Sequence, residues 1–418
     1  MDIVRAYGNV IRRTIDPHPA VTRRLIDAGL FYEANRARYF SDRRMPKAYV
    51  KLNTLAVGMI RQAMTHPKTT AWTNLFTPVE LLQCFDLNCL SAEAVSSFLS
   101  GFTIEDHFIN RAEAAGIAPT LCSYHKCFLG SIETGLLPLP KCAVTTSTVC
   151  DANFNTFRLM EKRTGCRTFF LDIPSEYSAD TLRYVKKQLK DLIRGLTETT
   201  GKAFDIDRLR EILQRENESK ACYRAYLTKK ADHAYPSTLT LQMYGLFATH
   251  LSIGTEETLD FFRMLQEEIE DRPVFHGKRI YWLYVFPFYH EVLKQAFNFS
   301  DRYQLQGMDM NIDYMEELSL SDPLSALAEK LIRNLYNLPA EERRQRILQE
   351  AKALKADGVI HFCHWGCKQS VGGAMLMKDA LAKEGLPMLI LDGDGTDRRN
   401  DAPGQIKTRL EAFLEVLG

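Results

Sequence analysis

Two stretches of the chain carry apolar residues at the three- and four-residue spacing of amphipathic helices. They are residues 1–65 and residues 176–275. Side chains at this spacing fall on one face of a helix and can be buried together. We therefore expect an N-terminal helical segment over 1–65 and a further helical segment over 176–275.

The other two stretches, 66–175 and 276–418, alternate short β-rich runs with helical segments. This alternation is typical of a parallel sheet with helices on its faces. We expect two α/β domains with these boundaries. Their predicted strands lie in the runs TAWTNLF, GIAPTLC, CAVTTSTVC and CRTFFLDIP, then KRIYWLYVFPF, GVIHFC and LPMLILDGDG.

The composition narrows the class of protein only a little. The 418 residues are 45% hydrophobic and 25% charged, with a formal net charge of +1, which excludes a disordered chain and shows no global preference for nucleic acid or lipid. The chain begins without an apolar signal core, and its longest apolar run, YWLYVFPF at 281–288, is too short to span a membrane. We expect a soluble cytoplasmic protein with reduced thiols.

The ten cysteines are the first chemical signal. In parallel α/β sheets, ligands bind beyond the carboxyl ends of the strands. Cys122, Cys150 and Cys363 each close a predicted strand and precede a predicted helix. A thiol there lies near the positive end of a helix dipole, which favours the thiolate that binds metal.

Two further cysteines follow a candidate ligand closely and are possible auxiliary ligands. Cys127 comes five residues after Cys122, and Cys367 four residues after Cys363. The remaining cysteines are expected to be structural, because they open strands or lie within helices and turns. They are Cys84, Cys89, Cys142, Cys166 and Cys222.

The spacing of the cysteines bears on the metal. No C-x2-C knuckle is present, which argues against a structural zinc held by local pairs. Three thiolates far apart in sequence suit an iron–sulfur cluster between two domains, with one iron left open. Buried thiols in a protein of unrelated function are the alternative.

Several runs resemble the 2-hydroxyacyl-CoA dehydratase and benzoyl-CoA reductase superfamily over most of residues 70–418. They are FTPVELL, STVCDANFNTFR, GVIHFCHWGCKQSVGG and the C-terminal LPMLILDGDGTDRRNDAPGQIKTRLEAFLEVL. The resemblance implies a subunit with two flavodoxin-like (Rossmann-like) α/β domains and a helical domain. It also implies one 4Fe–4S cluster on Cys122, Cys150 and Cys363.

The reaction implied by the resemblance is dehydration of a (R)-2-hydroxyacyl-CoA to the 2-enoyl-CoA through a ketyl radical, in an anaerobic lyase. The implied partners are the acyl-CoA, a second dehydratase subunit or a second copy, and an iron–sulfur activator that injects one electron with ATP hydrolysis. The chain has no Walker motif, consistent with ATP being handled elsewhere.

Glu80 matches the glutamate that the family places near the substrate, and it is a candidate acid/base together with His364. Thr77, Pro78 and Glu80 also form a capping-box pattern, which explains Glu80 without catalysis. Both interpretations stay open. Further polar residues near the candidate ligands are His125, His361 and Lys368.

Three alternatives to a dehydratase remain. A double-cubane reductase with an 8Fe cluster would need additional thiols, for which Cys127 and Cys367 are placed. A non-catalytic partner subunit of a dehydratase is the second alternative. Aromatic-ring reduction in place of dehydration is the third.

Overall fold

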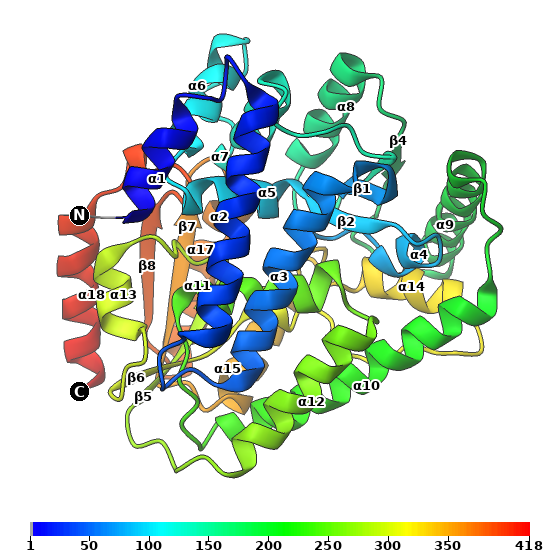
Figure 1. Ribbon diagram of the computed structural model, residues 1–418. Coiled ribbons are helices and arrows are strands. Elements are labelled where there is room, and N and C mark those ends of the chain that lie inside the picture. Colours follow the sequence, from blue (N-terminus) through cyan, green and yellow to red (C-terminus); the bar gives the residue numbers. More distant parts are fainter. Residues whose placement is uncertain (1–2) are drawn as a thin grey trace.

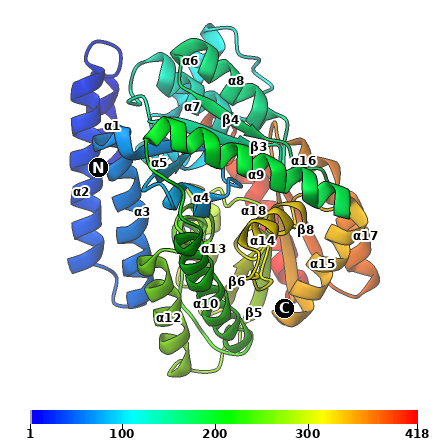
Figure 2. The same cartoon turned by 90° about the vertical axis from the view of Figure 1, so that its right-hand side faces the viewer.

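The N-terminal part of the protein is helical. A computed structural model describes residues 3–418 and is shown in Figures 1 and 2. Its first helices are α1 (Ile3–Arg12), α2 (Pro19–Tyr39) and α3 (Lys47–Thr65). The expected helices of this segment are confirmed from Ile3 onward, while residues 1 and 2 lie outside the described part. No helix among residues 3–418 is long and apolar enough to cross a membrane.

The first sheet has four parallel strands in the order β2-β1-β3-β4. They are β1 (Thr70–Thr73), β2 (Asn88–Ser91), β3 (Cys142–Thr146) and β4 (Thr168–Leu171). Every residue of β1 and β3 is buried, as expected for central strands that are covered on both faces. The helices that accompany them are α4 (Val79–Gln83), α5 (Ala92–Gly101), α6 (Glu105–Ala114), α7 (Ser123–Glu133) and α8 (Ala152–Thr164), after the single turn η1 (Pro67–Thr69).

A second group of helices follows, as the periodicity predicts. Its members are α9 (Ala179–Thr200), α10 (Ile206–Lys230), α11 (Leu239–Leu246), the π-helical turn η2 (Phe247–Leu251) and α12 (Glu256–Glu270). Capping residues set the start and end of α9: the Ser178 side chain accepts from the Thr181 N–H, and Gly201 ends it at φ +76°. In Figure 2, α9 runs across the front of the molecule, where it contacts both β4 and α14 (Pro323–Ile332).

The second sheet repeats the topology of the first. Its parallel strands are ordered β6-β5-β7-β8. They are β5 (Lys278–Leu283), β6 (Tyr303–Met308), β7 (Gly358–His364) and β8 (Met388–Gly393). The remaining elements are α13 (Glu291–Phe297), η3 (Asp309–Asn311), α15 (Ala340–Ala353), α16 (Lys368–Gly372), α17 (Ala374–Lys383), η4 (Arg398–Asn400) and α18 (Pro403–Leu417). In Figure 1, α18 flanks this sheet on the outer side.

The two matching strand orders confirm the expected α/β class with two flavodoxin-like parallel sheets and additional helices. Two strands, β2 and β6, are additions to the strands that the sequence predicts. The run that contains β2 has the pattern of a helix and turn. Only four residues of β2 are extended, and such a short element leaves little periodicity to detect.

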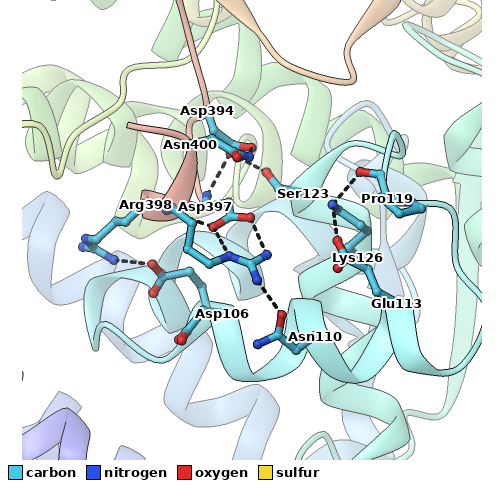
Figure 3. A network of polar contacts seen from close by, with 12 residues as sticks. Asp106, Asn110, Glu113, Pro119, Ser123, Lys126, Asp394, Asp397, Arg398 and Asn400 are labelled. Atoms are coloured by element: carbon cyan, nitrogen blue, oxygen red, sulfur yellow. Dashed lines mark hydrogen bonds and ion pairs between the residues drawn. The ribbon is translucent and has the colours of Figure 1, made fainter. Parts of the chain in front are cut away.

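The strand expected in GIAPTLC does not form, and residues 117–122 are a loop between α6 and α7. The two helices that this loop joins pack closely, since a Cβ on Gly130 would meet the Phe108 carbonyl oxygen at 1.8 Å. The Lys126 ammonium holds the loop by donating to the Pro119 carbonyl and the Glu113 carboxylate, both at 2.7 Å (Figure 3). Cys122 is consequently the residue before α7, not the last residue of a strand.

A buried ionic network joins three separate parts of the chain. The Lys330 ammonium of α14 donates to Glu80 Oε1 of α4 at 2.5 Å and to Glu216 Oε1 of α10 at 2.7 Å. Lys220 pairs with Glu216 at 2.8 Å. Burial raises the pKa of Glu80 to about 7, whereas the two lysines outweigh burial at Glu216 and lower its pKa. The network therefore depends on both lysines for its charge balance.

Replacing Lys330 with Met should destabilise the protein strongly, because Glu80 loses its cation and Glu216 keeps only one. We expect the free energy of unfolding, measured by urea titration, to fall by about 3–5 kcal/mol. The control is Lys187→Met, which breaks the exposed Lys187–Asp191 pair and should cost at most about 0.5 kcal/mol. Equal losses in the two variants would contradict a stabilising role for the network.

Candidate functional site

The carboxyl ends of both sheets line one cavity. Phe76 follows β1, Cys150 follows β3, Tyr284 follows β5 and Cys367 follows β7, and all four line the same space of about 160 Å³. The strand order reverses between β1 and β3 in the first sheet and between β5 and β7 in the second. Open α/β sheets bind ligands at such reversals. The cavity therefore lies at two such switch points at once.

Three cysteines face this cavity: Cys122, Cys150 and Cys367. They come from the loop before α7, the turn after β3 and the turn after β7. Burial raises the pKa of Cys122, and the nearby thiols of Cys367 and Cys150 raise it further. Burial likewise raises the pKa of Cys150 to about 11. Three thiols from distant parts of the sequence thus meet at one place.

Cys363, the third ligand that the sequence indicated, does not line the cavity. Adjacent residues of a strand point to opposite faces of the sheet, and His364 takes the cavity side of β7. The Cys363 thiol donates instead to the Ser370 carbonyl at 3.4 Å. Burial raises the pKa of this thiol, and the nearby negative charge of Asp392 raises it further. Cys367, named only as an auxiliary ligand, takes the place expected for Cys363.

Cys127, the other auxiliary candidate, lies in α7 within the hydrophobic core. It does not line the cavity with Cys122, although the two are close in sequence.

His364 is fixed against Cys122. The Gly395 N–H donates to His364 Nδ1 at 2.9 Å, so Nδ1 is an acceptor and the ring proton is on Nε2. Nε2 lies 3.1 Å from the Cys122 sulfur and donates to it. Burial lowers the pKa of His364, which favours this neutral ring. The histidine therefore orients the thiol and stabilises negative charge on its sulfur.

The loop after β8, in the second sheet, makes hydrogen bonds that hold His364 and the segment carrying Cys122 in place. The Asp394 carboxylate accepts from the Ser123 hydroxyl at 2.5 Å and from the Asn400 amide at 3.1 Å, as Figure 3 shows. It also accepts the backbone N–H groups of Thr396 and Asp397. Because Ser123 begins α7, this carboxylate ties the segment that carries Cys122 to the opposite sheet.

Backbone geometry at the cavity is also unusual. Gly366 has φ +79°, and a Cβ there would lie 2.7 Å from the Cys122 backbone nitrogen, so only glycine fits between the two cysteine loops. Val149 and Tyr284, which both line the cavity, have φ of +78° and +71°. Such angles are costly for side chains with a Cβ and tend to occur at functional sites.

Glu80 does not line the cysteine cavity. Its carboxylate is held by Lys330 in an adjoining cavity, and the capping box expected around it is also absent. The Thr77 hydroxyl donates to Asn74 Oδ1 at 2.8 Å and makes no cap, since α4 begins after Pro78. The capping-box interpretation of Glu80 is therefore wrong, whereas its role as an acid/base stays a prediction.

Glu93 is a carboxylate at the cavity that the sequence patterns did not single out. It lies in the first turn of α5, directly after β2, and it lines the cysteine cavity. Its Oε2 is buried without a hydrogen-bond partner, and burial raises its pKa. Glu93 follows the carboxyl end of a strand, so the rule applied to the cysteines would have selected it had β2 been recognised.

The other polar candidates divide between the cavity and its surroundings. His125 lines the cavity, and its Nδ1 lies 3.0 Å from the Thr156 hydroxyl. His361 points away, with Nε2 donating to the Ser370 carbonyl at 2.7 Å. Lys368 is exposed at the start of α16.

The donor set fits a cluster better than a single ion. Within residues 3–418, no three His, Cys, Asp or Glu side chains gather closely enough to hold one metal ion. Three thiols that line one cavity, Cys122 buried and Cys150 and Cys367 partly buried, are instead compatible with a cubane, because its ligands attach to different irons. Metal binding would have to displace the thiol protons of Cys122 and Cys150, and burial opposes their loss because it raises the pKa of both thiols.

The family of the chain follows from a match over most of its length. Residues 74–417 match the family model for 2-hydroxyglutaryl-CoA dehydratase, D-component. The chain belongs to this family. The recognition made from the sequence is thereby confirmed, and the chain is a member of an enzyme family of dehydratase subunits.

Individual relatives are distant but cover most of the chain. The (R)-phenyllactyl-CoA dehydratase alpha subunit of Clostridium sporogenes is 24% identical over 357 residues, which is 78% of this chain and 83% of that subunit. The (R)-2-hydroxyisocaproyl-CoA dehydratase alpha subunit of Clostridioides difficile is 22% identical, covering 85% and 92%. A benzoyl-CoA reductase polypeptide of Thauera aromatica is 24% identical, covering 81% and 86%.

The buried His125 should make stability depend on pH. Burial lowers its pKa to about 4, so the folded protein binds fewer protons than the unfolded chain between that pH and about 6.5. His125 contributes stability that is present above pH 6.5 and is lost as the pH falls toward 4, by about 3 kcal/mol. In His125→Gln, urea titrations across this range should show a correspondingly flatter profile. An unchanged profile would contradict this contribution.

Proposed function

We propose that this chain is the cluster-binding subunit of a 2-hydroxyacyl-CoA dehydratase, with one 4Fe–4S cluster held by Cys122, Cys150 and Cys367. The observation that carries the proposal is the convergence of these three thiols on one cavity at the carboxyl ends of both sheets. Three thiolates leave one iron of a cubane without a protein ligand. When bound, such a cluster supplies a one-electron donor and a Lewis acid for an oxygen of the substrate.

The substrate is a (R)-2-hydroxyacyl-CoA, and the product is the 2-enoyl-CoA. One-electron reduction of the thioester to a ketyl radical lets the α-hydroxyl leave as hydroxide and makes the β-proton acidic. The electron is returned at the end of the turnover, so the reaction is redox-neutral. The first electron comes from a separate activator protein that hydrolyses ATP.

The chain's own residues handle the proton. Among the described residues that line the cavity, Glu93 is the only carboxyl group, and the raised pKa favours its protonated form. In that form it donates a proton to the departing hydroxide, and the resulting carboxylate accepts the β-proton. The two transfers restore Glu93, so no net proton is taken up or released.

His364 is a positioning residue in this scheme. It donates to the Cys122 sulfur and receives the Gly395 N–H, so both ring nitrogens are engaged. This role replaces the acid/base role that the sequence suggested for His364.

The contacts of the remaining thiols disfavour the double-cubane alternative. Cys127 lies in the core, and the Cys84 thiol donates to the Glu80 carbonyl at 3.3 Å. Neither lines the cavity, although a second cubane there would need them. A partner subunit fits the relatives, because the chain also matches the (R)-phenyllactyl-CoA dehydratase beta subunit with 24% identity over 245 residues.

Substitution of single cysteines tests the ligand set. Anaerobically prepared wild-type protein should contain about four irons and four sulfides per chain. Cys367→Ala should lose most of this iron, because the cavity keeps only two thiols, while Cys363→Ala should retain it. Iron and sulfide analysis with the visible absorption spectrum gives the readout. The reverse pattern would return Cys363 to the ligand set, and about eight irons would favour the double cubane.

Glu93→Gln keeps the size of the side chain but removes its proton transfer. We expect kcat to fall by about 10²–10⁴-fold with the iron content unchanged. Glu80→Gln is the matched control and should keep kcat within about tenfold, since Glu80 lies outside the cysteine cavity. Loss of activity in Glu80→Gln together with normal activity in Glu93→Gln would assign the acid/base role to Glu80.

A further inference from the structure

One part of the lining of the cysteine cavity is apolar and aromatic. Met243 and Phe247 reach it from α11 and η2, and Phe98 reaches it from α5. Phe98 stacks on Tyr244 with ring centroids 5.6 Å apart and meets Phe247 edge-on at 5.8 Å. These rings form a continuous surface to which an apolar group can pack.

The described lining of the cysteine cavity contains no positively charged side chain that could pair with an anionic substrate group. Among the described residues that line the cavity there is no lysine or arginine, and the only carboxyl is Glu93. Both histidines of the lining already have partners in the chain: His125 Nδ1 lies 3.0 Å from the Thr156 hydroxyl, and His364 lies between the Gly395 N–H and the Cys122 sulfur. An anionic group placed here would be desolvated without a partner, which is strongly unfavourable.

The lysines of the adjoining cavity are already paired. Lys220 and Lys330 line an adjoining cavity that shares Leu75 and Phe76 with the cysteine cavity. Both lysines are engaged by Glu216, and Lys330 is also engaged by Glu80. They are therefore committed to buried carboxylates of the chain.

An aromatic partition separates the two cavities. The Phe76 ring packs edge-on against His250, with ring centroids 5.3 Å apart, and at a tilt of 46° against Tyr336, with centroids 5.5 Å apart. His250 is itself paired with Asp313 at 3.0 Å. A substrate acyl chain that extends from the cysteine cavity toward the lysines consequently meets the Phe76 ring before it reaches either cation.

We propose that the acyl chain processed at this site is apolar, either branched alkyl or arylalkyl, and that acyl chains ending in a carboxylate are excluded. The proposal rests on the proposed function, because it takes the thiols to mark where the reacting end of the substrate lies. The apolar wall binds the rest of the acyl chain through burial of apolar surface. Specificity arises from the absence of a free cation as much as from the apolar contacts.

Kinetics with three substrates test the proposal on the holoprotein, prepared anaerobically with its partner subunit and activator. The probes are the CoA thioesters of (R)-2-hydroxy-4-methylpentanoate, (R)-2-hydroxy-3-phenylpropanoate and (R)-2-hydroxyglutarate. We expect kcat/KM for either apolar substrate to exceed that for the dicarboxylic one by about 100-fold or more. Comparable values, or a preference for the 2-hydroxyglutaryl thioester, would overturn the proposal and leave the dehydratase function intact.

Equilibrium binding separates this proposal from the function on which it rests. Calorimetry with the non-reacting 2-enoyl-CoA products should show that 4-methylpent-2-enoyl-CoA and cinnamoyl-CoA bind at least about tenfold more tightly than glutaconyl-CoA. If the apolar products bind more tightly but none of the three hydroxyacyl-CoA substrates is dehydrated, the acyl-chain preference is retained and the dehydratase function is rejected. Equal affinities would reject the preference, and absence of binding by all three would reject both.

Introducing a cation tests the physical cause. Phe288 lies at a partly exposed position of the cavity lining, so Phe288→Arg should reduce the apolar-to-dicarboxylic ratio of kcat/KM by about tenfold or more. Val285→Lys is a second variant at a partly buried position and should act in the same direction. The control, Met375→Arg, places the charge on exposed α17 and should leave the ratio unchanged. An unchanged ratio in both folded cavity variants would contradict the charge argument.

Discussion

The meeting of two parallel sheets at their carboxyl ends is the constraint on which the rest of the structure depends. Each sheet alone offers a switch point with only part of a site. Cys150 comes from the first sheet and Cys367 from the second, and Cys122 lies on a loop between helices of the first. Only the apposition of both sheets brings the thiols to one cavity.

Polar contacts at the junction of the two sheets concentrate on the segment around Cys122. Asp394 holds Ser123, the Gly395 N–H orients His364, and His364 donates to the Cys122 sulfur. Gly366 lets the two cysteine loops approach without a Cβ between them. Together they link the second sheet to the α7 segment of the first domain. The chain therefore positions Cys122 from outside the domain that carries it, an arrangement suited to a site shared by two domains.

The sequence predicted much of the fold, because strand–helix alternation and helical periodicity report local burial. It predicted the site less completely. Cys150 and Cys122 both line the cavity, although the strand expected before Cys122 is a loop, and their role as ligands stays a prediction. The sequence favoured Cys363 as a ligand and gave Cys367 only as an auxiliary, whereas Cys367 lines the cavity and Cys363 does not, because the cavity side of β7 is taken by His364. Glu93 was missed because β2 has only four residues, whereas Glu80 was singled out through its match to the family's glutamate.

By itself, the sequence determined the α/β class and the two parallel sheets with their helices. It also indicated that some of its cysteines are candidate metal ligands. These properties follow from residue type and spacing, which act over a few turns or a single strand. The tertiary structure alone decided which thiols meet, that Glu93 rather than Glu80 shares their cavity, and that the lysines nearby are already paired. Those outcomes depend on how segments far apart in the chain are oriented toward one another, and no local pattern encodes that orientation.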